Sequence, residues 1–290
     1  MKSSVLTIAI VGLYTAAPIG MRAQMTDESS VPKVLMVTQE QVKEGREGAH
    51  ARSETAWPRI FQKGNVRTHY IGMASESGPS EAWFLEPYES FGAMEKERAA
   101  ILHSAMAPEL ETANVTDGEL RTGSRTLLTV FRGDLSFHAA EAMQSLPKCR
   151  YMGVTVLNIN YGREADLVQL AHLLIDGDEK SGSDQPALTY QVISGAPAVM
   201  YLLFAPMDSL ARMDAAPARS TATRQAMGER NRQHFDALAA EVVHSSENLL
   251  FSFDPRMSYV SKEFAAADPA FWTPAEPAKP AAKAKPARKP

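Results

Sequence analysis

The sequence contains a single cysteine among 290 residues, Cys149. An intramolecular disulfide is therefore excluded, and stability must come from a packed core. The flanking Lys148 and Arg150 could lower the pKa of this thiol and make it reactive. A linker cysteine without a chemical role is the simpler interpretation.

Several catalytic motifs are also missing. The chain has no glycine-rich nucleotide loop after a strand, no Gly-x-Ser-x-Gly, no His-Glu-x-x-His and no cysteine cluster. These absences weigh against a kinase, a nicotinamide enzyme, a hydrolase and a structural zinc protein. The formal net charge is -4 although the last residues are basic, so the body between the termini is acidic. An acidic body does not favour nucleic acid as a partner.

The two termini differ from the body in composition. Residues 1–24 combine Lys2 with an apolar run and a small residue near Gln24, which predicts a signal peptide and a periplasmic or secreted protein. The run is short for a membrane anchor, and no later segment is long enough to span a bilayer. Residues 274–290 consist largely of Pro, Ala and Lys, which predicts a disordered tail. This basic tail could contact an anionic envelope, or it could serve only as a solubilising tether.

A duplicated pattern dominates the body. Ser77-Gly78-Pro79 precedes an aromatic strand and a Ser-capped helix, and Ser194-Gly195-Ala196-Pro197 does the same about 117 residues later. A repeat of this length indicates a duplicated domain. We therefore divide the body into repeat 1 (33–140) and repeat 2 (150–262).

Each repeat shows the element order β-α-β-β-α-β, which is the ferredoxin-like unit. In repeat 1 we expect strands at 34–38, 66–73, 81–86 and 126–131, with a helix after Gly45 that Pro58 interrupts and another capped by Ser90. In repeat 2 we expect strands at 154–159, 188–194, 199–204 and 248–253. Its helices should follow Gly162 and Ser209, the latter as a repeated cap, with a long helix over about 223–243.

The third strand of each unit is apolar at consecutive positions, as in Ala82-Trp83-Phe84-Leu85. A sheet that is wet on one face would alternate instead, so both faces should be covered. We predict an α+β fold in which two tandem ferredoxin-like units close into an eight-stranded barrel within one chain.

The duplicated units resemble the dimeric α+β barrel superfamily, and more narrowly its uncharacterised exported bacterial members. Antibiotic-biosynthesis monooxygenases and chlorite-dismutase-like proteins are more distant. The resemblance implies a ligand site inside the barrel or between sheet and helices, but it implies no particular reaction because this frame carries many chemistries.

The candidates for such a site are aromatic and polar residues of the strands and first helices. They are His69, Tyr70, Trp83 and Trp57 in repeat 1, and Tyr190, Gln191 and Tyr201 in repeat 2. His69 stands out because an imidazole in the middle of a strand needs a partner or a cavity. For Trp57, Trp83, Tyr190 and Tyr201, a place in the core is the simpler interpretation.

No metal site is expected. His50 and Glu54 lie one helical turn apart, a spacing that can hold a metal, but two groups are too few and a solvated pair is the simpler interpretation. His172 could be a haem ligand by analogy with haem-binding relatives, although no haem motif surrounds it. We expect no cofactor.

The favoured function is binding of a small, partly apolar ligand in a cavity. The alternative is a monooxygenase or a haem-dependent oxidoreductase of the same fold, and a third hypothesis is an interaction module that uses the basic tail. The sequence does not predict the ligand or the oligomeric state.

Overall fold

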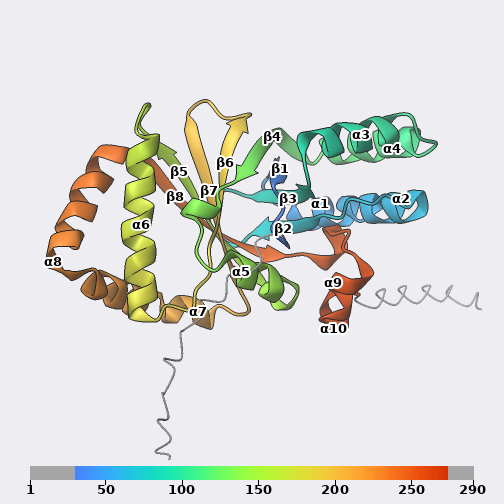
Figure 1. The fold of residues 1–290 in the computed structure, drawn as a ribbon. Coiled ribbons are helices and arrows are strands. Elements are labelled where there is room, and N and C mark those ends of the chain that lie inside the picture. Colours follow the sequence, from blue (N-terminus) through green and yellow to red (C-terminus); the bar gives the residue numbers. More distant parts are fainter. Residues whose placement is uncertain (1–29, 274–290) are drawn as a thin grey trace, which may run out of the picture.

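The computed structural model describes residues 30–273, and the predicted signal peptide and tail lie outside that range. Its eight strands form one closed barrel in the order β1-β3-β2-β8-β5-β7-β6-β4, in which all neighbours are antiparallel (Figure 1). The strands are β1 (Val34–Val42), β2 (Ile71–Ser75), β3 (Glu81–Tyr88), β4 (Arg121–Phe131), β5 (Tyr151–Ile159), β6 (Leu188–Ser194), β7 (Val199–Met207) and β8 (Val243–Phe253). This confirms the predicted α+β fold with an intramolecular barrel.

Two seams join the halves. Strand β2 pairs with β8, where Met73 lies opposite Phe253, and β4 pairs with β6, where Val130 lies opposite Gln191. Each half contributes four strands in the ferredoxin-like order. Because both seams carry backbone hydrogen bonds, neither half leaves a free sheet edge at this barrel.

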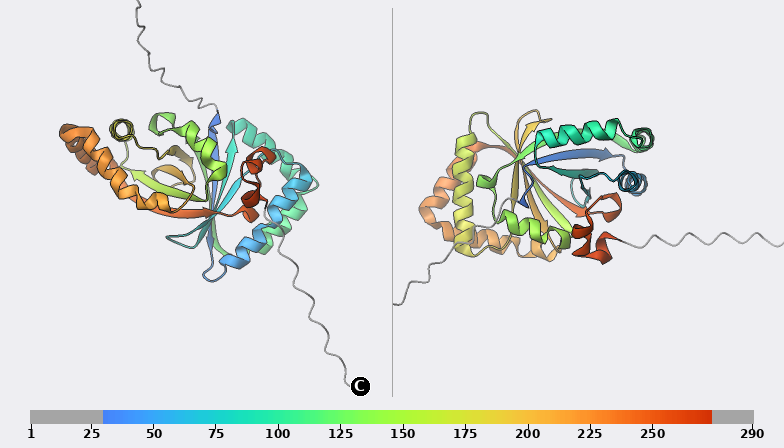
Figure 2. Two further views of the ribbon diagram at one scale, coloured as in Figure 1. Left: turned by 90° about the horizontal axis from the view of Figure 1, so that it is seen from below. Right: turned by 45° about the vertical axis from the view of Figure 1, so that its right-hand side comes forward.

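Helices cover the barrel on two opposite sides (Figures 1 and 2). The first half supplies α1 (Glu47–Glu54), α2 (Ala56–Gly64), α3 (Phe91–Leu102) and α4 (Ala107–Gly118). The second half supplies α6 (Glu164–Ser181), α7 (Ala211–Asp214) and α8 (Ala216–Val242), with a break in α8 at Gly228. Three short helices contribute residues to the apolar core inside the barrel. They are α5 (Ala139–Ser145), α9 (Lys262–Ala266) and α10 (Pro269–Trp272).

The third strands show why both sheet faces are apolar. In β3, Trp83 and Leu85 point into the barrel core, whereas Ala82 and Phe84 belong to the cluster beneath α1 and α2. In β7, Leu202 points inward and Tyr201 packs in the cluster beneath α6 and α8. The barrel interior and the helical layers thus each take one face of the same strand.

Three local expectations need correction. Strand β2 begins only at Ile71, because the backbone N–H groups of Arg67 and Thr68 donate to the Glu97 carboxylate instead of a neighbouring strand. Ser90 caps α3 as predicted, accepting from the Ala93 N–H at 3.1 Å. Ser209 does not repeat this cap, since its hydroxyl donates to Asp208 and the helix that follows is a single turn. Helix α4 was not anticipated at all.

Candidate functional site

A cavity of about 480 Å³ opens where several strands meet α3, α5 and α9. Its wall is mostly apolar, and three of the seven predicted site residues, His69, Tyr70 and Tyr190, lie in it. Those three come from both halves of the chain. Further lining residues include Leu35, Leu85, Tyr88, Ala93, Glu97, Met152, Leu188, Phe204 and Phe264.

His69 lies in the segment before β2 and not in the middle of a strand as the sequence suggested. Glu97 of α3 fixes this segment by accepting from the backbone of Arg67 and Thr68 and from the Thr68 hydroxyl. The imidazole stacks on Tyr259, with ring centroids 4.7 Å apart. Partial burial lowers the pKa of His69 below its ordinary value, so a neutral ring faces the cavity at neutral pH.

The two tyrosines of the wall are anchored differently. The Tyr190 hydroxyl donates to the Pro32 carbonyl at 3.0 Å, and burial raises its pKa. Tyr70 is buried, and its hydroxyl has no hydrogen-bond partner among the described residues. Burial first, and then the charge of Glu54, raises the pKa of Tyr70. Both phenols therefore stay protonated. The ring of Tyr70 packs against Phe61 and Phe84 in the cluster beneath α1 and α2.

The other four candidates lie away from this cavity. Trp83 is in the barrel core and donates to Glu81 at 2.7 Å. Gln191 accepts from Arg132 at 3.0 Å. Trp57 packs edge-on against Phe61 beneath α2, and Tyr201 lies in the apolar cluster beneath α6. These placements are those of structural residues.

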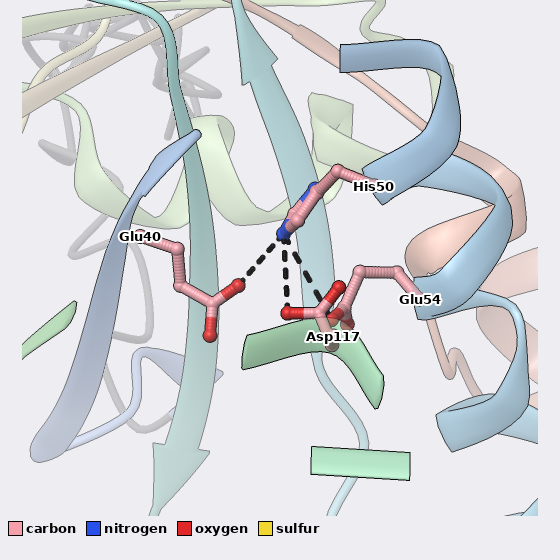
Figure 3. A group of neighbouring side chains, drawn as sticks. All are labelled: Glu40, His50, Glu54 and Asp117. Carbon is pink, nitrogen blue, oxygen red and sulfur yellow. Dashed lines mark hydrogen bonds and ion pairs between the residues drawn. The ribbon is translucent and has the colours of Figure 1, made fainter. Parts of the chain in front are cut away.

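A second site, which sequence reasoning missed, lies between the barrel wall and the helices of the first half. Glu40 of β1, His50 and Glu54 of α1, and Asp117 of α4 point toward one another (Figure 3). Their side chains are only 1–7% exposed. The His50 Nε2 atom lies 2.9 Å from Glu40 Oε2, 3.5 Å from Asp117 Oδ2 and 4.0 Å from Glu54 Oε1. We call these four residues the polar cluster.

Arg121, at the start of β4, borders the polar cluster. Its Nε lies 3.0 Å from Asp117 Oδ2, and its other nitrogens donate to Glu40 and Asn114. Burial alone would lower the pKa of His50, but hydrogen bonds to Asp117 and Glu40 raise it to about 9. Burial and the neighbouring carboxylates raise the pKa of Glu54 to about 9 as well.

The predicted solvated pair of His50 and Glu54 is therefore wrong, because both residues are buried. Their one-turn spacing was the only visible signal. Glu40 lies beyond the strand predicted at 34–38, and Asp117 belongs to the helix that the sequence did not suggest. Only the fold brings these two carboxylates to the histidine.

Two other sequence hypotheses can be placed. The thiol of Cys149 is buried, and burial raises its pKa, which opposes the activation suggested by Lys148 and Arg150. His172, considered as a haem ligand, is exposed on α6 and lines neither the cavity nor the polar cluster.

Comparison with solved structures finds likenesses of fold at very low identity. An anthrone oxidase-like protein matches with a TM-score of 0.49 and 10% identity, covering 77% of this chain and 91% of the other. A proposed monooxygenase from Lactobacillus acidophilus matches with a TM-score of 0.46 and 8% identity, covering 77% and 94%. A variant of the chlorite dismutase from Candidatus Nitrospira defluvii, in complex with cyanide, matches with a TM-score of 0.45 and 10% identity, covering 78% and 93%.

Two of these neighbours, the proposed monooxygenase and the chlorite dismutase, are of kinds that the resemblance from the sequence also named. Neither the protein-family models nor the curated protein sequences give a match. At such identities the likeness says nothing about activity.

Proposed function

We propose that this protein binds a small, largely apolar molecule in the 480 Å³ cavity beside His69. Cavities of about 300–1,000 Å³ with apolar walls and a few placed polar groups are typical ligand sites. One observation carries the proposal: apolar strand residues from both halves line one cavity together with the imidazole of His69 and the ring of Tyr190.

The chemistry of the wall indicates the kind of ligand. His69 is neutral, and its N–H is directed to the backbone of Arg67, so its other ring nitrogen can accept one hydrogen bond. The hydroxyl of Tyr190 is already engaged with Pro32. Glu97 lines the cavity, but its oxygens accept from Thr68 and Arg67. A neutral, mainly aromatic or aliphatic molecule with one or two polar atoms fits these groups best.

The test uses the neutral fluorescent probe N-phenylnaphthylamine, together with native mass spectrometry for a co-purified molecule. We expect saturable probe binding by the wild-type protein. Ala93 is an exposed residue of α3 in the cavity lining, so Ala93→Trp should fill the mouth without disturbing the core. The substitution should weaken binding by at least about ten-fold, or about 1.4 kcal/mol.

Ala100→Trp is the matched control, because Ala100 is also exposed on α3 but does not line the cavity. Its probe affinity should equal that of the wild type. Equal binding by both tryptophan variants would place the probe elsewhere and remove the support for this site.

The alternative, a monooxygenase or haem-dependent oxidoreductase, stays a prediction from the resemblance. A Soret band in the purified protein would support the haem form. Oxygen uptake with quinol-like substrates would support the cofactor-free form.

We also propose that the protein acts outside the cytoplasm, on the basis of the predicted signal peptide. In the described part of the chain, no helix combines the length and apolarity that a membrane span requires. Cell fractionation of the full chain and of a chain lacking 274–290 tests both the export and the proposed contact of the basic tail with an anionic envelope.

A further inference from the structure

We propose that the polar cluster, Glu40, His50, Glu54 and Asp117, binds one divalent first-row transition-metal ion. This site is separate from the small-molecule cavity and does not depend on the function proposed for it. Five considerations support the inference: the donor set, the geometry, an unsatisfied buried oxygen, the apolar filling of the corresponding place in the second half, and an acidic pocket beside His50.

The donors are one imidazole nitrogen and three carboxylates. Imidazole suits zinc, iron, nickel and copper, and carboxylates suit manganese and also complete zinc and iron sites. Magnesium and calcium prefer all-oxygen sites, so an imidazole in the set disfavours them. The combination points to Zn²⁺, Fe²⁺ or Mn²⁺.

The geometry is close to that of a coordination shell. One ligand atom from each residue lies within 4.8 Å of every other. Donors at about 2.0–2.2 Å from a shared metal lie roughly 3–4 Å apart. The distances from His50 Nε2 to Glu40, Asp117 and Glu54, at 2.9, 3.5 and 4.0 Å, fall in or next to that range. Only small side-chain shifts are needed.

Asp117 provides support that is independent of the distances within the cluster. The residue is 1% exposed, and its Oδ1 atom has no hydrogen-bond partner among the described residues. An unsatisfied buried carboxylate oxygen is costly and uncommon in a folded protein. A metal ion would satisfy it. Arg121 holds the Oδ2 atom of the same carboxylate from outside the cluster, at 3.0 Å through its Nε. A metal ligand is commonly oriented by such an outer contact.

The second half of the chain shows that this place in the fold does not require polar residues. The register of β5 with β8 matches that of β1 with β4, so that Ile159 opposite Val243 corresponds to Val42 opposite Arg121. The corresponding residues beneath α6 and α8 are all apolar: Leu157, Leu167, Ala171, Ala239 and Val243. Since an apolar core suffices there, the buried charges of the first half call for a separate explanation.

A pocket with an acidic lining lies beside one member of the polar cluster, His50. This pocket of about 270 Å³ has His50 in its wall, and Glu47, Glu76 and Glu81 also line it. The residues that line this pocket include no lysine or arginine. An acidic pocket of this kind raises the local concentration of cations.

The test begins with untagged full-length protein that is stripped with a chelator and dialysed into metal-free buffer. We titrate it with Zn²⁺ and with Mn²⁺, and we measure bound metal after gel filtration by inductively coupled plasma mass spectrometry. The expected result is one equivalent of at least one of these ions per chain. Crystals grown with that ion should show its anomalous signal between His50 and Asp117.

The variants are nearly isosteric. Glu54→Gln and Asp117→Asn each remove one carboxylate and should weaken metal binding by at least about ten-fold. Glu111→Gln is the matched control, because Glu111 is exposed on α4, the helix of Asp117, and belongs neither to the donor set nor to the lining of the acidic pocket. Its affinity should change less than about three-fold.

The wild-type protein provides a further measurement should a variant fail to fold. A bound ion should raise the melting temperature saturably, because it stabilises the folded state alone. The proposal is overturned by wild-type protein that binds neither ion stoichiometrically, by equal losses in Glu111→Gln and Glu54→Gln, or by an anomalous peak elsewhere.

Discussion

The two halves of this chain share a strand order and a register but differ in what lies between sheet and helices. The first half buries Glu40, His50, Glu54 and Asp117 beside Arg121, and the second half buries an apolar cluster around Leu167 and Tyr201. The same arrangement of strands and helices can therefore hold either buried charged residues or an apolar cluster between sheet and helices. The apolar half shows what the fold needs for stability, and the polar half shows where the fold can place chemistry.

The largest expected effect comes from breaking the charge pairing in the first half. Arg121→Met removes the guanidinium that pairs with Glu40 and Asp117, so that the protonated His50 alone must offset both carboxylates, and it should lower the free energy of unfolding by about 3–5 kcal/mol. Urea unfolding in the presence of a chelator measures this loss. A loss below about 1 kcal/mol would mean that water reaches the two carboxylates.

A further variant gives the first half an apolar filling of the same kind as that of the second half. It combines Arg121→Met with Glu40→Leu, His50→Leu, Glu54→Leu and Asp117→Leu. Because removing every member of a buried charged group is often neutral or stabilising, it should recover most of the stability that the single substitution loses. A combined variant no more stable than Arg121→Met would show that the two halves are not interchangeable in this way.

The two hairpin glycines offer a second comparison. Gly78 and Gly195 have φ values of +84° and +96°, which disfavour other residues. A Cβ at Gly195 would clash with the backbone carbonyl of Thr126, whereas at Gly78 it would meet only the movable side chain of Leu249. Gly195→Ala should therefore cost about 3 kcal/mol or more and Gly78→Ala about 1–2 kcal/mol. Chemical denaturation checks the order, and equal costs would contradict it.

The smallest expected effect is the pH dependence of probe affinity in the cavity. The pKa of His69 is lowered because burial favours its neutral form. As the pH falls from 7 to 5, protonation places a charge in the apolar wall, and affinity for N-phenylnaphthylamine should fall by a few-fold. Glu97 and Glu263 act in the opposite sense by favouring the charged ring. His69→Gln should bind with the same affinity at both pH values, and a persistent pH dependence would assign it to another group.

Much of the barrel could be predicted because its signals are local or repeated. The Gly-turns at Gly78 and Gly195 mark the hairpins, and the doubly apolar strands at Trp83 and Tyr201 imply cover on both faces. Where the expectation was wrong, a long-range contact decided the outcome. The backbone N–H of Thr68 donates to Glu97 and not to a neighbouring strand. Strand β2 is therefore shorter than predicted, and His69 lies in the cavity wall.

The candidate sites show the same division. His69, Tyr70 and Tyr190 were chosen as aromatic and polar residues of the strands and first helices, but Trp57, Trp83, Gln191 and Tyr201 were chosen on the same grounds and lie elsewhere. Residue type does not reveal which face of a strand meets a void. The sequence did not predict the complete polar cluster for another reason. Asp117 is 77 residues from Glu40 along the chain and lies on an unpredicted helix.

The sequence alone determined the duplication, the order of elements and the need for each sheet to be covered on both faces, because these follow from periodicity and turn chemistry. The tertiary structure alone decided which side chains share a space. Closure of the barrel places Tyr190 and His69 in the wall of one cavity, and the packing of α1 against α4 brings Asp117 to His50. Such proximity depends on the path of the whole chain, and no local pattern of residues records it.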